Sequence, residues 1–130
     1  MERPMGDVRF TDRELDIMEV LWSRGPSTVA EVQESLADDL AYNTVLTMLG
    51  VLEDKGHVTR DREGRAHRYA PTVERDAAGR SELDRVTDRL FGGSPEAVLL
   101  QLVDRGKLDD EDLRRMRDLL QSRLGKEDEP

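Results

Sequence analysis

The sequence predicts a mostly α-helical fold with one small β-hairpin, divided between residues 1–72 and residues 73–130. Three observations predict this fold. Apolar residues recur every three to four positions over most of the chain, which is typical of amphipathic helices. One stretch alternates apolar and polar residues instead, as the strands of a hairpin do. Capping residues, glycines and prolines lie where these patterns begin and end.

The first helix is expected to begin after Thr11. Thr11 and Glu14 have the spacing of a capping box, in which each side chain accepts a hydrogen bond from the other residue's backbone amide. Gly25 and Pro26 end the helix, because proline lacks an amide hydrogen and clashes with a continuing helical turn. The apolar side of this helix is expected to consist of Leu15, Ile17, Met18, Val20, Leu21 and Trp22.

Two further helices follow. The second begins at another candidate capping box, formed by Thr28 and Glu31. The third runs from about Tyr42 to Lys55, and Gly56 stops it because glycine readily takes the left-handed conformation that ends many helices. The buried side of these two helices is expected to consist of Val29, Val32, Leu36, Val45, Met48, Leu49 and Leu52.

A hairpin comes next. Its strands are expected at residues 58–62 and 66–70, joined across Glu63 and Gly64, with Val58 and Tyr69 packing it onto the helices. Pro71 closes the second strand, since proline cannot donate to a β-ladder. Three helices followed by a hairpin is the element order of a winged helix-turn-helix domain.

The region after residue 72 is predicted to be helical. Ser94 and Pro95 form a favoured helix start, and the acidic residues at 109–112 suit the positive end of a last helix. Little chain remains to cover the apolar sides of these helices, so we expect them to form a dimer. The residues expected in this contact are Leu83, Val86, Leu90, Phe91, Leu113, Met116 and Leu120.

The third helix carries the best candidates for nucleic-acid binding. Asn43, Thr44 and Thr47 lie opposite its apolar side, where the second helix of a helix-turn-helix meets base edges in the major groove. Asparagine can bond adenine, and a threonine methyl group can pack on thymine. The alternative is that these residues only begin a solvated helix. Tyr42 is a further candidate, either as a phosphate contact or as a ring that stacks on the domain.

Four arginines surround the predicted hairpin loop, and arginine suits phosphate through its planar set of donors. We take Arg62, Arg65 and Arg68 as candidates for DNA binding. The alternative for Arg60 or Arg68 is an ion pair with the acidic pair at residues 53–54. The net charge is −9, but residues 41–70 hold 5 basic and 4 acidic residues, whereas residues 1–40 hold 4 and 10. The least acidic part of the chain is therefore the part assigned to DNA.

Several function classes are excluded. The chain has no cysteine, which rules out disulfides and thiolate sites. The first ten residues lack the apolar segment of a secretory signal, and the apolar cluster at residues 97–103 is too short for a membrane span, so we expect a soluble cytoplasmic protein. His57 and His67 have no cysteine partners for a metal site. We expect no cofactor, metal, small-molecule substrate or enzymatic activity.

Residues 11–22 (TDRELDIMEVLW), 41–56 (AYNTVLTMLGVLEDKG) and 64–71 (GRAHRYAP) together resemble the BlaI/MecI family of penicillinase repressors. The resemblance implies a homodimer that binds a palindromic operator in double-stranded DNA and represses transcription. It assigns DNA contact to Asn43, Thr44 and Thr47, and to Arg65 and Arg68 in the hairpin.

The resemblance also implies a membrane sensor-protease as a partner, which cleaves the tail helix of some members. The position that matches their cleaved Asn-Phe bond reads Gln101-Leu102 in this sequence. Winged helices also bind proteins, and most of this chain is acidic. A protein-interaction module without DNA binding is therefore the alternative function.

Overall fold

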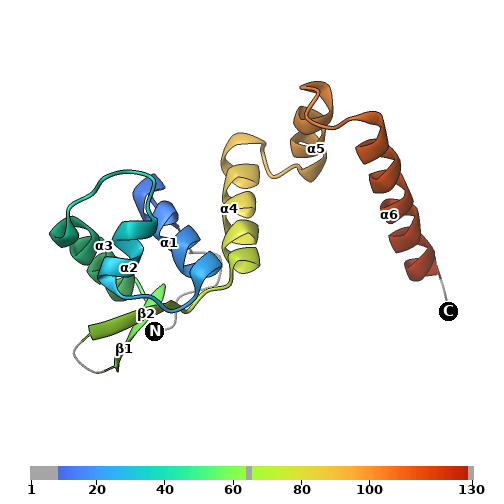
Figure 1. Cartoon of the computed structure of the whole chain (residues 1–130). Coiled ribbons are helices and arrows are strands. Elements are labelled where there is room, and N and C mark those ends of the chain that lie inside the picture. The colour runs from blue at the N-terminus through green and yellow to red at the C-terminus, as the bar shows by residue number, and fades with distance from the viewer. Residues whose placement is uncertain (1–8, 64–65, 129–130) are drawn as a thin grey trace. The chain divides into compact units, whose positions relative to one another are not determined.

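The computed structural model describes residues 9–63 and 66–128. In chain order its elements are α1 (Asp12–Arg24), α2 (Val29–Ser35), α3 (Tyr42–Asp54), β1 (Val58–Glu63), β2 (Ala66–Pro71), α4 (Arg75–Leu90), α5 (Pro95–Asp104) and α6 (Asp110–Asp128) (Figure 1). The predicted mostly helical fold, with three helices before a single hairpin, is confirmed. The chain forms two compact units, of which one ends at Arg85 and the other begins at Val86. The first unit thus runs past residue 72, where we placed the division between DNA binding and dimerisation; that division of roles stays a prediction.

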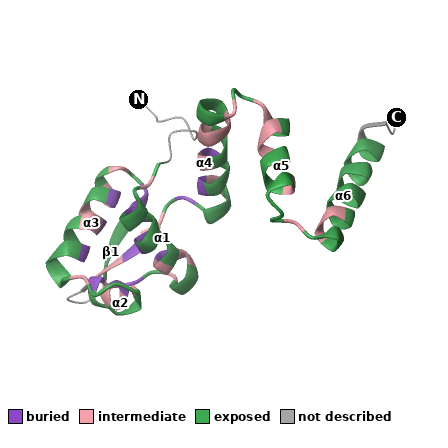
Figure 2. Cartoon of the chain, turned by 90° about the horizontal axis from the view of Figure 1, so that it is seen from above, coloured by how far each residue is buried: buried purple, intermediate pink, exposed green. Residues whose placement is uncertain are grey.

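One apolar core holds the first unit together. Figure 2 shows its buried residues on α1, α3 and α4. Each fully buried aliphatic side chain contributes roughly 1.5–3 kcal/mol relative to an exposed one. The core consists of Ile17, Met18, Leu21, Val29, Val32, Val45, Leu49, Leu52, Val58, Tyr69, Val73 and Ala78.

Both predicted capping boxes are present. In each, the threonine Oγ1 accepts the glutamate amide at 3.2 Å, and the glutamate Oε1 accepts the threonine amide at 2.8 Å for Thr11 and 2.9 Å for Thr28. Gly25 and Gly56 follow α1 and α3 with φ of 91° and 83°, a conformation that favours glycine. Local sequence therefore determines where α1, α2 and α3 lie along the chain.

The predicted apolar side of the first helix is wrong at Leu15, which is 41% exposed. Glu14 is buried in its place, because its carboxylate completes the capping box and also meets Lys55. The Lys55 Nζ atom donates to both carboxylate oxygens of Glu14 at 2.9 Å. This ion pair joins the start of α1 to the end of α3, so the two helices are linked by charge as well as by the core.

The hairpin is antiparallel, with Val58 opposite Pro71 and Glu63 opposite Ala66. Glu63 therefore belongs to β1, and the expected loop at Glu63-Gly64 is one residue out of place. The connection consists of residues 64–65, which lie outside the described residues. On the other edge of β2, Ser27 and Tyr69 exchange two backbone hydrogen bonds of 3.0 and 2.8 Å. The segment between α1 and α2 thus fixes the hairpin against the helices.

Helix α4 begins at Arg75, well before the apolar pattern that starts at Leu83. Its first turns carry the buried small residues Ala78 and Ser81, which give only a weak apolar signal in sequence. The indole nitrogen of Trp22 donates to the Val73 carbonyl at 2.9 Å and fixes the approach to this helix. Among the described residues, no helix combines the length and apolar character needed to cross a membrane.

The Glu14–Lys55 ion pair predicts that stability depends on pH. Burial opposes ionisation of Glu14, but hydrogen bonds from the Thr11 amide and Lys55 outweigh it and hold the pKa of Glu14 below its ordinary value of 4.5. The stabilisation is therefore fully present well above pH 4.5 and is lost as the pH falls through the lower folded-state pKa. We expect Glu14→Gln to lower the free energy of unfolding by roughly 1–3 kcal/mol at pH 7 in urea denaturation, and by less below pH 4.5.

Glu19→Gln is the matched control. Glu19 also forms an ion pair, with Arg75 at 3.0 Å, but both side chains are more than half exposed. Loss of an exposed pair costs about 0–1 kcal/mol. Equal losses in the two variants, or a loss in Glu14→Gln that is as large at pH 3 as at pH 7, would contradict the stabilising role of the Glu14–Lys55 pair.

Candidate nucleic-acid interface

Helix α3 turns one polar side outward. Val45, Leu49 and Leu52 are fully buried against the core, so the opposite side of the helix must face solvent. The predicted residues Asn43, Thr44 and Thr47 are all exposed on α3. The N-cap residue of α3 is Ala41, whose side chain accepts no hydrogen bond from the first amides of the helix. These three side chains are therefore accessible, as the predicted contact with base edges requires.

A groove lies beside the start of α3. It has a volume of about 200 Å³ and joins three elements: the beginning of α2, the first turns of α3 and the hairpin. Tyr42 is 48% exposed and lines this groove together with residues of the hairpin. The lining residues are Thr28, Val29, Tyr42, Leu46, Arg60, His67 and Tyr69.

Sequence reasoning missed Leu46, Thr28 and His67 as neighbours of Tyr42. Leu46 follows Tyr42 by one helical turn, a spacing that could have indicated it. His67 and Tyr69 are two residues apart on β2, so their side chains share one face of the hairpin. No sequence spacing indicates Thr28, because it reaches the groove through the bridge between Ser27 and Tyr69, which are far apart in the chain.

The hairpin arginines lie on both faces of the ribbon. Arg62 is opposite His67 in the register, and Arg68 is opposite Asp61. Since directly opposed residues share a face and neighbours alternate, Arg62 and Arg68 point to different sides. Arg62 is exposed, and no other described residue forms an ion pair with it. Arg65 lies outside the described residues.

Arg68 contacts the start of α2. Its Nη1 atom lies 3.0 Å from Glu31 Oε1. The same carboxylate also accepts the Thr28 amide and meets Arg24 at 3.1 Å. The Thr28 hydrogen bond, with Arg68 and Arg24 adding to it, lowers the pKa of Glu31 and keeps it charged. Arg68 pairs with Glu31 because the bridge at Ser27 places β2 beside α2.

Arg60 does form the alternative pair that the sequence suggested. Its Nε atom lies 3.5 Å from Glu53 Oε2, near the end of α3. Helix α3 itself contains no basic residue and ends in Glu53 and Asp54, while Lys55 is bound to Glu14. Arg60 of the hairpin therefore brings a basic side chain to the end of a helix that has none of its own.

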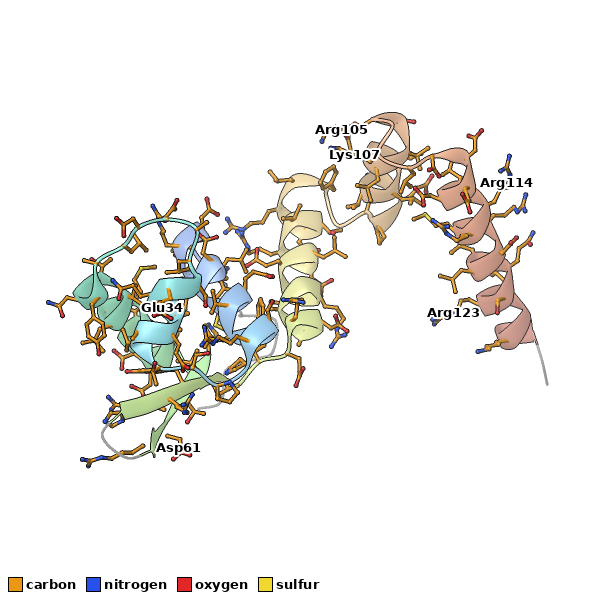
Figure 3. The ribbon with its side chains drawn as sticks, in the orientation of Figure 1. Glu34, Asp61, Arg105, Lys107, Arg114 and Arg123 are labelled. Atoms are coloured by element: carbon orange, nitrogen blue, oxygen red, sulfur yellow. The ribbon has the colours of Figure 1, made fainter. Side chains whose placement is uncertain are left out.

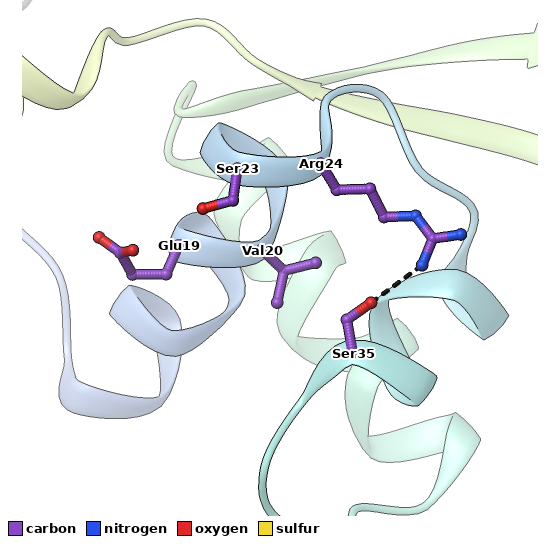
Figure 4. Close-up of a pocket in the computed structure, with 5 residues that line it drawn as sticks. All are labelled: Glu19, Val20, Ser23, Arg24 and Ser35. Atoms are coloured by element: carbon purple, nitrogen blue, oxygen red, sulfur yellow. Dashed lines mark hydrogen bonds between the residues drawn. The ribbon is translucent and has the colours of Figure 1, made fainter.

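A larger depression of about 360 Å³ lies between α1 and the end of α2 (Figure 4). It is lined by Glu19, Val20, Ser23, Arg24 and Ser35. Arg24 reaches across it and donates to Ser35 Oγ at 2.9 Å. This site combines both charge signs with hydroxyl groups and lacks a nucleophile paired with a base. Within residues 9–63 and 66–128, no group of three or more histidine, aspartate or glutamate side chains could hold a metal ion.

The second unit exposes much of its apolar surface. Neither α5 nor α6 carries a buried described residue (Figure 2). The expected dimer residues are of two kinds. Val86, Phe91 and Leu113 are half-buried. Exposed ones are Leu83, Leu90, Met116 and Leu120, with Leu90 at 76%. Gln101 and Leu102 are exposed side chains within the helical backbone of α5.

Comparison with known proteins completes the description of this surface. Residues 10–122 match a protein family described as penicillinase repressor. The transcriptional regulator BlaI of Mycobacterium tuberculosis is 42% identical over 109 residues, which are 80% of this chain and 78% of that protein. A penicillinase repressor of Bacillus licheniformis is 23% identical over 123 residues, 93% of this chain and 96% of that one. The crystal structure of the transcriptional regulator Tm0710 from Thermotoga maritima shares the fold, with a TM-score of 0.52, 21% identity, and coverage of 88% of this chain and 74% of that chain.

Proposed function

Since the chain belongs to the penicillinase repressor family and is a DNA-binding transcriptional repressor, not an enzyme, we propose that it binds a palindromic operator as a homodimer in the cytoplasm. One observation supports the mode of binding above all others. The polar outer side of α3 lies next to a hairpin that carries arginines. The family match favours this function over a protein-interaction module.

The residues divide into two roles. Asn43, Thr44 and Thr47 enter the major groove and read base edges. Tyr42, Arg62, Arg65 and Arg68 bind the sugar–phosphate backbone, which fixes the register of the protein but carries no base sequence. Arg62 is ready for this role because no other described residue pairs with it. Arg68 must exchange Glu31 for phosphate.

The second unit supplies the homodimer. Leucines on α5 and α6 expose a large apolar surface, which is unusual for a protein that stays monomeric. A second copy of the chain covers this surface in the dimer. A two-fold axis then presents two α3 helices to half-sites one or two turns of DNA apart. The membrane sensor-protease enters as a partner that cleaves at Gln101-Leu102, for which α5 must first unwind because proteases bind extended chain.

The first prediction from this proposed function separates the two roles on α3 and the hairpin. We expect Asn43→Ala to weaken operator binding roughly 5- to 150-fold and to leave non-specific DNA binding unchanged, because a bidentate base contact is lost. Arg62→Ala should weaken operator and non-specific DNA alike and should reduce the salt dependence of log Kd by about one per protomer. Fluorescence anisotropy on DNA from the chain's own promoter, across salt concentrations, measures both.

Arg80→Ala is the control for Arg62→Ala. Arg80 is an exposed arginine on α4, so its substitution removes the same charge at a different site. Equal effects of the two arginine variants would contradict a contact by Arg62. Wild-type protein that does not bind DNA, or binds without salt dependence, would overturn the proposed function.

The second prediction concerns the ion pair of Arg68. Glu31→Gln keeps the capping box, since glutamine also serves in it, but removes the charge that holds Arg68. We expect a higher affinity for operator DNA, because the carboxylate that competes with phosphate for Arg68 is removed. Glu34→Gln, one turn along α2 and exposed (Figure 3), changes the net charge equally and is the control. An affinity no higher than that of Glu34→Gln would show that Arg68 does not exchange Glu31 for phosphate.

The third prediction concerns the dimer. Leu120 is 56% exposed on α6, so we expect Leu120→Glu to preserve helicity but to yield monomers and weaken operator binding. Gln121→Glu places the same charge on the neighbouring exposed residue and should remain dimeric. Sedimentation at micromolar concentration distinguishes these outcomes. A monomeric wild-type protein would refute the homodimer.

A further inference from the structure

Gly50 lies in the middle of α3, on its outward side. Asn43, Thr47, Gly50 and Asp54 are spaced by four, three and four residues, so they form one line along the helix. The three residues of this line that have side chains are exposed, and Gly50 is partly exposed between them. The line runs from the base-reading end of α3 to its acidic end.

A glycine at this position weakens the free protein. Inside a helix, glycine lowers the ratio of folded to unfolded protein about fivefold relative to alanine. The usual reasons for glycine do not apply here. Gly50 is not among the residues with positive φ, and a Cβ atom added to it would meet no atom within 4 Å. Nothing in the described part of the chain therefore requires the absence of a side chain at Gly50.

We propose that Gly50 is the point at which operator DNA approaches the backbone of α3 most closely, so that even a methyl group cannot fit. The inference rests on the proposed function. Asn43 and Gly50 are separated by about 10 Å along the helix, which is within the roughly 12 Å width of the major groove. When Asn43 meets base edges, Gly50 is still beside DNA.

Asp54 marks the end of this contact. It lies one turn beyond Gly50 on the same line, and its carboxylate is repelled by phosphate. Helix α3 has no basic residue that could offset this repulsion. The helix must therefore diverge from DNA after Gly50. Close approach of the backbone at Gly50 gives α3 a contact with DNA that does not depend on charge.

The experiment compares Gly50→Ala with Gly79→Ala. Gly79 is an exposed glycine on α4, and a Cβ atom there also meets nothing within 4 Å. Both variants should melt about 3–6 °C higher than wild type, because alanine favours the helix. We expect Gly50→Ala to bind operator DNA at least tenfold more weakly and Gly79→Ala to bind it as wild type does.

The outcomes separate this inference from the function on which it rests. Operator binding by wild type tests the proposed function alone. If wild type binds and Gly50→Ala binds equally well, the close approach at Gly50 is refuted while the repressor function stands. A lower melting temperature of Gly50→Ala would also refute it, because the free protein would then itself need the glycine.

Discussion

Burial of one side of α3 is the constraint on which the remaining structure depends. Val45, Leu49 and Leu52 have no exposed surface, and they pack against residues of α1, α2 and the hairpin. Because a helix has only one opposite side, this packing determines which residues face outward. The ion pair of Glu14 with Lys55 adds a polar link between the end of α3 and the start of α1. Packing in the core therefore determines which side of α3 faces outward, and the polar residues on that side do not.

The positive charges near this surface lie on the hairpin and not on α3 itself. The chain carries a net charge of −9, and α3 itself has no basic residue. Arg60 and Arg68 are each held by a glutamate of a neighbouring helix, whereas no other described residue forms an ion pair with Arg62. Positive groups thus lie beside a polar helix, and an anion that binds Arg60 or Arg68 must compete with the glutamate that each one contacts. Such an arrangement favours selective over non-specific association.

Sequence alone predicted the features that depend on neighbouring residues. Two capping boxes, the glycine at Gly56 and the burial of Val45, Leu49 and Leu52 on α3 depend on spacing within a few residues, and these are confirmed. Met48, which was expected with them, is only half-buried. Contacts between distant segments were harder to foresee. The pairing of Arg68 with Glu31 depends on the bridge of Ser27 with Tyr69, and the burial of Glu14 in place of Leu15 depends on Lys55. Neither partner is indicated by a local pattern. The groove beside Tyr42 was missed for the same reason, since three separate elements form it.

The two hydrogen bonds between Ser27 and Tyr69 have a consequence for the energetics of association. They attach the hairpin to the segment that precedes α2, while the buried ring of Tyr69 holds it to the core. The hairpin and α3 thus form a preorganised pair before any encounter with a ligand. Little conformational entropy is then lost at that encounter, because the ordering has already occurred during folding. A contact of given area can then yield a higher affinity.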